Sequence, residues 1–314
     1  MVFLSACEPR VSVGDLGESS GGSAGAKPNA KLPVTEAGAS AAAPTGEAGA
    51  GGAGLAGPDE ETGGASAGKG GSSAGSGGSV GSGPNPLTPY EPRSGSFKLL
   101  AYSRTTGFRH DSAILAGRAL LQQIADEQGF ELVATEDNAF LADLSSFEVL
   151  FFLNTTGDVF NQQEEQLYEQ WMTRGGGFVG THSATDTENG WQFYSEVTGQ
   201  YYDGHGPAGV TTNLELEPSL LEHPTLKGLP NPWQHTDEWP RFNSYQSWSL
   251  KPGFKILVRN PTEAQPVSWL REWGSFRAFY TALGHDGQAF TDPVMKQHLA
   301  RGIMWAARRE HLIE

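Results

Sequence analysis

Four short stretches of this chain each place a histidine beside a carboxylate or a hydroxyl group. They cover residues 107–112, 181–186, 235–239 and 280–286, and they contain His110, His182, His235 and His285. An imidazole binds zinc and similar ions through one ring nitrogen, and it exchanges a proton near neutral pH. A neighbouring carboxylate can orient the other ring nitrogen. These residue types therefore predict either metal binding or acid–base catalysis.

Predicted strands precede these histidines. The short apolar runs lie at residues 97–102, 130–135, 147–153 and 178–180. The third run is nearly continuous in hydrophobicity, which is typical of parallel strands buried on both faces. His110 follows the first run and His182 follows the fourth, while His285 follows a later β run. Because the carboxyl ends of parallel strands meet at one rim of an open sheet, we expect these histidines to converge there. Glu238 is expected to reach the same rim from a long excursion.

Helical spacing of apolar residues separates the strands. One helix is expected to begin near Asp111 or Ser112, either of which can cap it. A second is predicted over residues 161–173, with Leu167 and Trp171 one turn apart on its buried face. Alternating strands and helices of this length imply a parallel sheet with right-handed crossovers.

The later part of the chain changes character. Residues 269–273 and 276–280 flank a Gly-Ser turn and predict a hairpin that adds antiparallel strands at one edge. Residues 294–309 predict a closing amphipathic helix. The fold class is therefore a doubly wound α/β domain with a mostly parallel sheet and an added antiparallel edge.

Composition divides the chain into parts. Residues 8–95 are dominated by Gly, Ala, Ser and Pro, and they are expected to form a disordered linker, since they cannot bury enough apolar surface to offset their ordering entropy. The folded domain is predicted over residues 96–309, followed by a short tail at 310–314. The formal net charge of -15 argues against nucleic acid as a partner and suits a small neutral ligand or a cation.

The single cysteine, Cys7, lies far from the predicted domain. The run Leu4-Ser5-Ala6-Cys7 matches the lipobox of bacterial lipoproteins, in which the cysteine is lipidated. This predicts an exported protein at the cell envelope that meets the membrane only through its lipid anchor and whose long tether follows Cys7. Residues 1–7 would be the remnant of a signal whose charged and apolar regions lie upstream. A chance match to the lipobox is the alternative.

The domain resembles a known family in four ordered motifs. These are residues 107–110 (GFRH), 177–184 (GFVGTHSA), 237–239 (DEW) and 277–285 (RAFYTALGH). They are similar to the ThuA-like, or trehalose-utilisation, family over about residues 97–309. The resemblance implies a flavodoxin-like fold related to class I glutamine amidotransferases, and a link to sugar catabolism.

The related amidotransferases carry a nucleophilic cysteine where this chain has Thr181-His182. Glutamine hydrolysis through a thiolate is therefore excluded. Ser183 remains conceivable as a nucleophile, but His182 is badly placed to activate it, because adjacent residues on an extended chain point to opposite sides.

We predict His110, His182, His285 and Glu238 as the catalytic group. The three histidines are the candidate ligands of a divalent metal such as zinc, and Glu238 is the candidate base. The competing interpretation gives the histidines acid–base roles without a metal, because the chain has no His-Glu-x-x-His or similar zinc signature. Asp237 and His235 rank below Glu238.

Six further residues are predicted to bind the substrate, with structural alternatives for several. They are Arg109, Ser183, Asp186, His205, Trp239 and Asp286. The loop of His205 is either a lid or a turn, and Asp286 could equally cap the segment that follows it. The aromatic residues Trp239, Trp233, Tyr201 and Tyr202 could stack on a sugar ring or pack in the core. The remaining histidines, His223, His298 and His311, are expected to be structural or exposed.

Two functions from different classes fit these residues. One is an enzyme that acts on a disaccharide, glycoside or keto-sugar by proton transfer, with or without metal assistance. The other is a non-catalytic sugar-binding or interaction module tethered to the envelope. No Gly-x-Gly-x-x-Gly loop follows the first strand, so neither a nicotinamide nor a flavin cofactor is expected.

Overall fold

The computed structural model describes residues 91–242 and 245–313, which all belong to one unit of the chain. Cys7 and the predicted linker as far as residue 90 lie outside the described residues. No helix of the described part combines the length and the apolar character that a membrane span requires.

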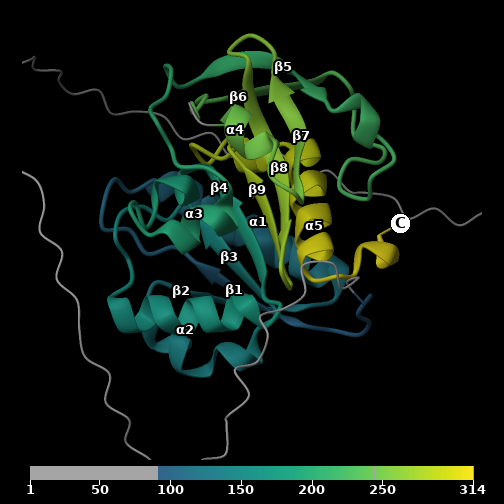
Figure 1. The fold of residues 1–314 in the computed structure, drawn as a ribbon. Coiled ribbons are helices and arrows are strands. Elements are labelled where there is room, and N and C mark those ends of the chain that lie inside the picture. The colour runs from purple at the N-terminus through teal and green to yellow at the C-terminus, as the bar shows by residue number, and fades with distance from the viewer. Residues whose placement is uncertain (1–90, 243–244, 314) are drawn as a thin grey trace, which may run out of the picture. The chain divides into compact units, whose positions relative to one another are not determined.

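In the described part of the chain, the strands form one sheet in the order β2-β1-β3-β4-β9-β8-β7-β5-β6 (Figure 1). The strands are β1 Lys98–Tyr102, β2 Glu131–Thr135, β3 Val149–Leu153, β4 Gly177–Thr181, β5 Val210–Leu216, β6 Trp233–Asp237, β7 Phe254–Asn260, β8 Gln265–Trp273 and β9 Phe276–Thr281. The first five positions in this order are parallel and reproduce the flavodoxin-like arrangement. The predicted doubly wound fold is confirmed.

Register places the ends of the central strands side by side. Leu153 of β3 pairs with Thr181 of β4, and Thr181 pairs with Thr281 of β9. The residues that follow these three positions therefore leave the sheet at one rim. His182 comes directly after Thr181, and His285 follows Thr281 by one short turn.

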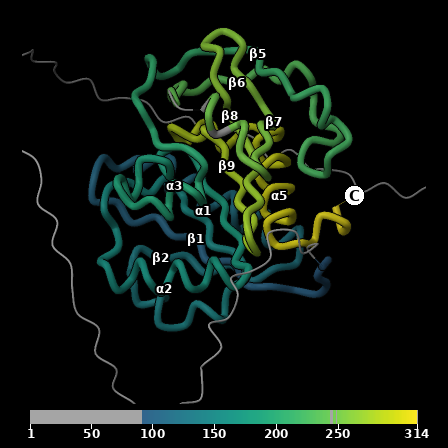
Figure 2. Tube along the Cα trace, in the orientation of Figure 1, coloured from purple at the N-terminus to yellow at the C-terminus, as the bar shows by residue number. Residues whose placement is uncertain are grey.

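The antiparallel edge is larger than the predicted hairpin. Strands β8, β7, β5 and β6 continue the sheet beyond β9, each antiparallel to its neighbour. They gather at the end of the domain opposite α2 (Figure 2). Val210 of β5 pairs with Asp237, the last residue of β6, so the Asp237–Trp239 stretch begins where this added edge ends.

Helices cover both faces of the sheet. They are α1 Asp111–Gln128, α2 Gln162–Thr173, α3 Gln192–Thr198, α4 Tyr245–Ser249 and α5 Pro293–Ala306, with 3-10 turns at η1 Asn138–Ser146, η2 His182–Asp186, η3 Pro218–Leu220, η4 Ala289–Thr291 and η5 Glu310–Leu312. Helices α1 and α5 contact each other on one face. On the other face, Phe152 of β3 meets Tyr168 of α2 and Tyr194 of α3.

Two local expectations about helices were wrong. The buried face of α2 holds Tyr168 and Met172, whereas Leu167 is 37% exposed. The N-cap of α1 is His110, and its side chain makes no capping bond. Asp111 lies inside the helix, where it pairs with Arg109. His110 is therefore held at the helix start with its imidazole free to face the rim.

Candidate functional site

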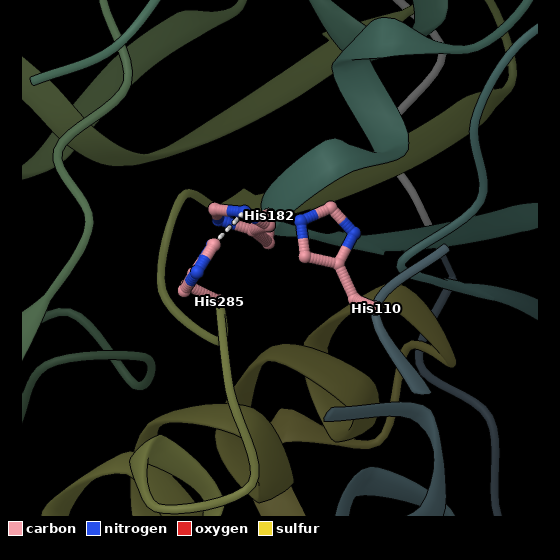
Figure 3. A group of neighbouring side chains, drawn as sticks. All are labelled: His110, His182 and His285. Atoms are coloured by element: carbon pink, nitrogen blue, oxygen red, sulfur yellow. Dashed lines mark hydrogen bonds between the residues drawn. The ribbon is translucent and has the colours of Figure 1, made fainter. Parts of the chain in front are cut away.

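Three histidines from separate parts of the chain meet at the rim (Figure 3). His110 begins α1, His182 directly follows β4, and His285 follows β9. One ring nitrogen from each lies within 4.8 Å of those of the other two. His182 Nε2 lies 3.3 Å from His285 Nδ1. The three histidines therefore converge as the strand order predicts, with their imidazole rings next to one another.

His182 is held in an uncommon backbone conformation. Its φ is +45°, in the left-handed region that non-glycine residues seldom adopt outside functional sites. The Tyr280 hydroxyl donates to the His182 carbonyl oxygen. The Nδ1 of His182 lies 3.1 Å from the Ala282 carbonyl oxygen, which can only accept, so Nδ1 carries the proton. The lone pair of Nε2 therefore faces the other histidines.

Glu238 adds a carboxylate to the cluster. Its Oε2 lies 3.6 Å from His182 Nε2 and 3.4 Å from His285 Nδ1. Its Oε1 lies 2.8 Å from Nδ1 of His205. The Glu238 residue is only 6% exposed, so its contacts are almost entirely with protein groups.

The protonation states follow from burial and charge. Burial lowers the pKa of His110 to about 3, helped by repulsion from His182 and His285. Burial also lowers the pKa of His182. The hydrogen bond to Glu238 raises the pKa of His285. Burial raises the pKa of Glu238, but its contacts with His285 and His182 outweigh burial, so that pKa is lowered overall. The cluster thus offers two neutral imidazoles and a carboxylate at neutral pH.

Behind the cluster, buried polar groups fix its backbone. Asp237 accepts the N–H of Gly284 at 2.7 Å and the N–H of His285 at 3.0 Å. His235 bridges Asp237 at 3.2 Å and Asp292 at 2.7 Å. Burial lowers the pKa of His235, but the two carboxylates outweigh this and raise it to about 9. His235 is therefore an imidazolium between two carboxylates, and it orients the group that holds the His285 loop.

The cluster opens into a cavity of about 270 Å³. Its lining residues are Phe108, His110, Thr156, His182, Ser183, Asp186, Tyr202, His205, Glu238, Pro240 and His285. Phe108, Tyr202 and Pro240 supply apolar wall. The Tyr202 ring stacks on the His205 ring, 6.0 Å between centroids and 23° between planes. The cavity therefore combines a titratable floor with an apolar wall, as sites for small polar ligands do.

Most of the predicted site residues lie together. His110, His182, His285 and Glu238 form the cluster. The predicted substrate residues Ser183, Asp186 and His205 line the cavity.

Three predicted substrate residues do not line the cavity. The Trp239 indole is buried and donates to the Val210 carbonyl, so it packs in the core. The Arg109 guanidinium pairs with Glu136 and Asp111 and does not reach the cavity. Asp286 accepts the backbone N–H groups of the turn that follows it, which is the capping role named as its alternative.

The structure shows which of the aromatic residues line the cavity and which pack elsewhere, and it places one of the remaining histidines in the core. Tyr202 lines the cavity, whereas Trp233 donates to Asp292 in the core and Tyr201 donates to the Trp191 carbonyl. His298 is fully buried against Ser268, which fits the expected structural role.

Ser183 has a different histidine neighbour from the one considered in the sequence. Its Oγ lies 3.4 Å from Nδ1 of His110, in the wall of the cavity. This separation exceeds the 2.6 to 3.2 Å of an active nucleophile and base pair by a small margin.

Some residues that support or line the cavity were missed in the sequence, and another was ranked low. Asp237 was placed below Glu238, yet it supports the His285 loop. Asp292, Thr156, Phe108 and Pro240 were not singled out. Asp292 precedes Pro293 at a helix start, so its N-cap role had a sequence signal, but its contact with His235 had none.

The chain matches a family model described as ThuA, trehalose utilisation, over residues 98–306. Two solved structures share its fold. A ThuA-like protein from Bacteroides uniformis ATCC 8492 is 21% identical with a TM-score of 0.59, and the match covers 70% of this chain and 95% of that one. A ThuA-like protein from Parabacteroides merdae ATCC 43184 is 20% identical with a TM-score of 0.54, over 68% of this chain and 90% of that one. No curated protein matches the chain in sequence. With the family model spanning most of the chain, and the four motifs at one rim of the expected sheet, this protein belongs to the ThuA, or trehalose-utilisation, family.

Proposed function

We propose that this protein is a metal-dependent enzyme that acts on a carbohydrate by proton transfer. His110, His182 and His285 would hold a divalent cation such as zinc, and Glu238 would act as the base. The observation that carries the proposal is the convergence of three imidazole nitrogens and a buried carboxylate in one cavity.

The donor set fits a borderline-soft divalent ion. Metal ligation requires neutral imidazoles, and burial keeps His110 and His182 neutral. The Ala282 carbonyl fixes the His182 tautomer, which is the usual outer-shell arrangement of a metal-binding histidine. Two nitrogens bound to one zinc ion lie at most about 4.2 Å apart. The ring nitrogens of the three histidines lie within 4.8 Å of one another, and small rotations of the partly exposed rings of His110 and His285 would bring them within this limit.

The protein groups have distinct roles in this proposal. When bound, the ion would polarise a sugar carbonyl or hydroxyl as a Lewis acid. Glu238 is anionic, lies 2.8 Å from His205, and can accept a proton from a sugar carbon or hydroxyl. The Nδ1 of His205 also lies 2.7 Å from the Gly206 carbonyl oxygen, which can only accept, so this nitrogen carries a proton and donates to Glu238, which holds the carboxylate in place. Glu238 would then give its proton back to the product. Asp186 can accept hydrogen bonds from sugar hydroxyls.

A carbohydrate is the favoured substrate class for two reasons. The cavity has Tyr202 in its wall beside polar groups, and an aromatic side chain beside hydroxyl acceptors suits a pyranose ring. The family is described by trehalose utilisation. Trehalose, other glucosides and their keto derivatives are therefore the first compounds to test.

Metal content of the purified full chain is the first test. We expect one equivalent of a transition metal before chelation, and its loss in His182→Ala. The control is His311→Ala, because His311 is exposed and far from the cluster in sequence. A His182→Ala protein that keeps its full metal content would refute the assignment.

Turnover separates the candidate functions. Substrate consumption that needs the metal supports the enzyme. Saturable sugar binding without turnover supports the sugar-binding module instead. Ser183→Ala is the third arm, because a serine nucleophile next to His110 predicts complete loss of turnover with the metal retained. The metal-dependent proposal predicts that Ser183→Ala keeps the metal and still turns the substrate over, although a lost contact with the substrate can raise KM.

A further inference from the structure

A second group of acidic side chains lies beside the wall of the histidine cavity. It consists of Asp158 in the loop after β3, Glu165 on α2 and Glu188 in the loop after η2. One carboxylate oxygen from each lies within 4.8 Å of those of the other two. Asp158 is exposed, Glu165 is half-buried and Glu188 is buried, so the group forms a cup with one open side.

Glu188 is the unusual member of this group. The residue is only 1% exposed. Its Oε1 accepts the backbone N–H groups of Val159 and Phe160, both at 2.8 Å. Its Oε2 is buried and has no hydrogen-bond donor among the residues that the structure describes. A buried carboxylate oxygen without a donor is costly, and the carboxyl groups of Asp158 and Glu165 lie close to the same carboxylate.

Tyr168 provides an independent observation. It lies three residues after Glu165 on the same face of α2, and its ring is fully buried. Its hydroxyl also lacks a hydrogen-bond partner in the described part of the chain. Burial raises its pKa, and the charge of Glu188 raises it further. Two buried polar atoms with unmet hydrogen-bonding capacity thus belong to one small region.

These carboxylates also lack cationic partners in the described part of the chain. Within residues 91–242 and 245–313, none of the three forms an ion pair with a Lys, Arg or His side chain. Burial raises the pKa of Glu188 to about 7, and its contact with the Asp158 carboxyl group raises it too, both as a hydrogen bond through a shared proton and by charge, although the two backbone N–H groups oppose this. The group therefore needs either a shared proton or a cation.

We propose that Asp158, Glu165 and Glu188 bind a divalent oxygen-preferring cation, with calcium as the first candidate and magnesium as the second. Calcium takes carboxylate oxygens at 2.3 to 2.6 Å, so two ligands on opposite sides of one ion lie about 4.8 Å apart. The observed spread of the three oxygens falls within this limit. The open side of the cup leaves room for the waters that complete the coordination.

The cation would clamp two loops that also shape the cavity. The Gly157 N–H donates to the Asp186 carbonyl at 2.8 Å, and the Glu188 N–H donates to the Gly157 carbonyl at 3.1 Å. Thr156 and Asp186 on these loops line the histidine cavity. The site uses oxygen ligands only, so it is separate from the nitrogen-rich cluster and does not depend on the function proposed for that cluster.

Thermal unfolding of the chelator-treated full chain tests the proposal. At pH 8, added calcium is expected to raise the melting temperature of the wild type and of His182→Ala. Glu188→Gln should lose at least nine-tenths of the calcium affinity, while its amide oxygen can still accept the Val159 and Phe160 N–H groups. Asp158→Asn is the second variant, since an exposed residue can be changed without harm to folding. Glu169→Gln is the control, because it removes an exposed charge from the same helix.

Terbium luminescence gives a second readout. Two aromatic residues adjoin the group and can sensitise a bound Tb³⁺ ion: Tyr168 lies one helical turn after Glu165, and the Trp191 backbone N–H donates to the Glu188 carbonyl oxygen at 3.1 Å. Calcium should displace the signal, and Glu188→Gln should abolish it. The proposal is overturned if neither calcium nor magnesium shifts the wild-type melting temperature and Tb³⁺ gives no signal that depends on Glu188. A stability that rises on acidification without any cation effect would assign the group to a shared proton instead.

Discussion

The Asp237 carboxylate accepts the backbone N–H of His285 at 3.0 Å, across 48 residues of sequence. The same carboxylate accepts the N–H of Gly284, whose φ of +112° turns the chain toward the cluster. A residue at the end of the antiparallel edge thereby sets the position of an imidazole that follows a parallel strand. The added edge of the sheet is part of the site for this reason.

Asp237→Asn is expected to weaken zinc binding by about 10- to 100-fold, the usual effect of removing an outer-shell group. An asparagine offers one acceptor oxygen where the carboxylate offers two, so one N–H of the His285 loop loses its partner. Competition with a chromophoric chelator measures the affinity. Asp126→Asn is the control, because that carboxylate is exposed and accepts a hydrogen bond from Gln122 on its own helix. Unchanged affinity in Asp237→Asn would show that the loop needs no such anchor.

The raised pKa of His235 predicts that the folded protein loses stability at alkaline pH. Its pKa is about 9 in the folded protein and near 6.5 when unfolded, so the folded state holds the proton more tightly. The stabilisation is full below pH 6.5 and disappears as the pH rises through 9, with a magnitude of about 3 kcal/mol at most. Urea unfolding at both pH values measures it. His235→Gln should show a clearly smaller difference between the two pH values, and an equal difference would contradict the assignment.

Glu238→Gln is expected to lower kcat by about 100-fold or more while the metal stays bound, since the amide keeps the shape of the side chain but cannot accept a proton. Steady-state kinetics on the substrate found in the screen, together with metal analysis, provide the measurement. Glu222→Gln, at an exposed position, is the matched control. Loss of the metal in Glu238→Gln would instead make the carboxylate a ligand.

Tyr202→Ala is expected to raise KM by about fivefold, because stacking of a sugar on an aromatic face contributes on the order of 1 kcal/mol. Its effect on kcat should be smaller. Tyr202→Phe keeps the face and should restore the KM, which separates stacking from hydrogen bonding by the hydroxyl. Equal KM values in all three proteins would remove Tyr202 from the substrate site.

The choice of which face of α2 is buried predicts how much two substitutions lower the free energy of unfolding. Met172 is fully buried, so Met172→Ala should cost about 2 to 5 kcal/mol of unfolding free energy. Leu167 is 37% exposed, and Leu167→Ala should cost less than about 1 kcal/mol. Denaturant titration of both variants measures the difference. Similar costs for the two would favour the face expected from the sequence.

Helix α2 shows that the spacing of apolar residues alone does not identify the buried face of a helix. Leu167 and Tyr168 are adjacent, and both belong to apolar series with helical spacing, 167 with 171 and 168 with 172. The choice between the two faces depends on Phe152 and Tyr194, which pack against Tyr168 from a strand and another helix. These contacts do not exist until the sheet has formed.

The sequence by itself determined the strand and helix order, the parallel character of the first half of the sheet, and the positions of His110, His182 and His285 near the ends of strands. These features depend on local patterns of apolar and polar residues, which can be read along the chain. It also determined that the domain has no cysteine nucleophile.

Only the tertiary structure decided which polar groups act together. Arg109 and Asp286 have the same kinds of polar group as the residues that line the cavity, but Arg109 pairs with a neighbouring carboxylate and Asp286 accepts backbone N–H groups. Asp237 and Glu188 became important because folding buried their carboxylates beside distant parts of the chain. Burial and long-range contact set the energy of a polar group, and neither is encoded in the spacing of nearby residues.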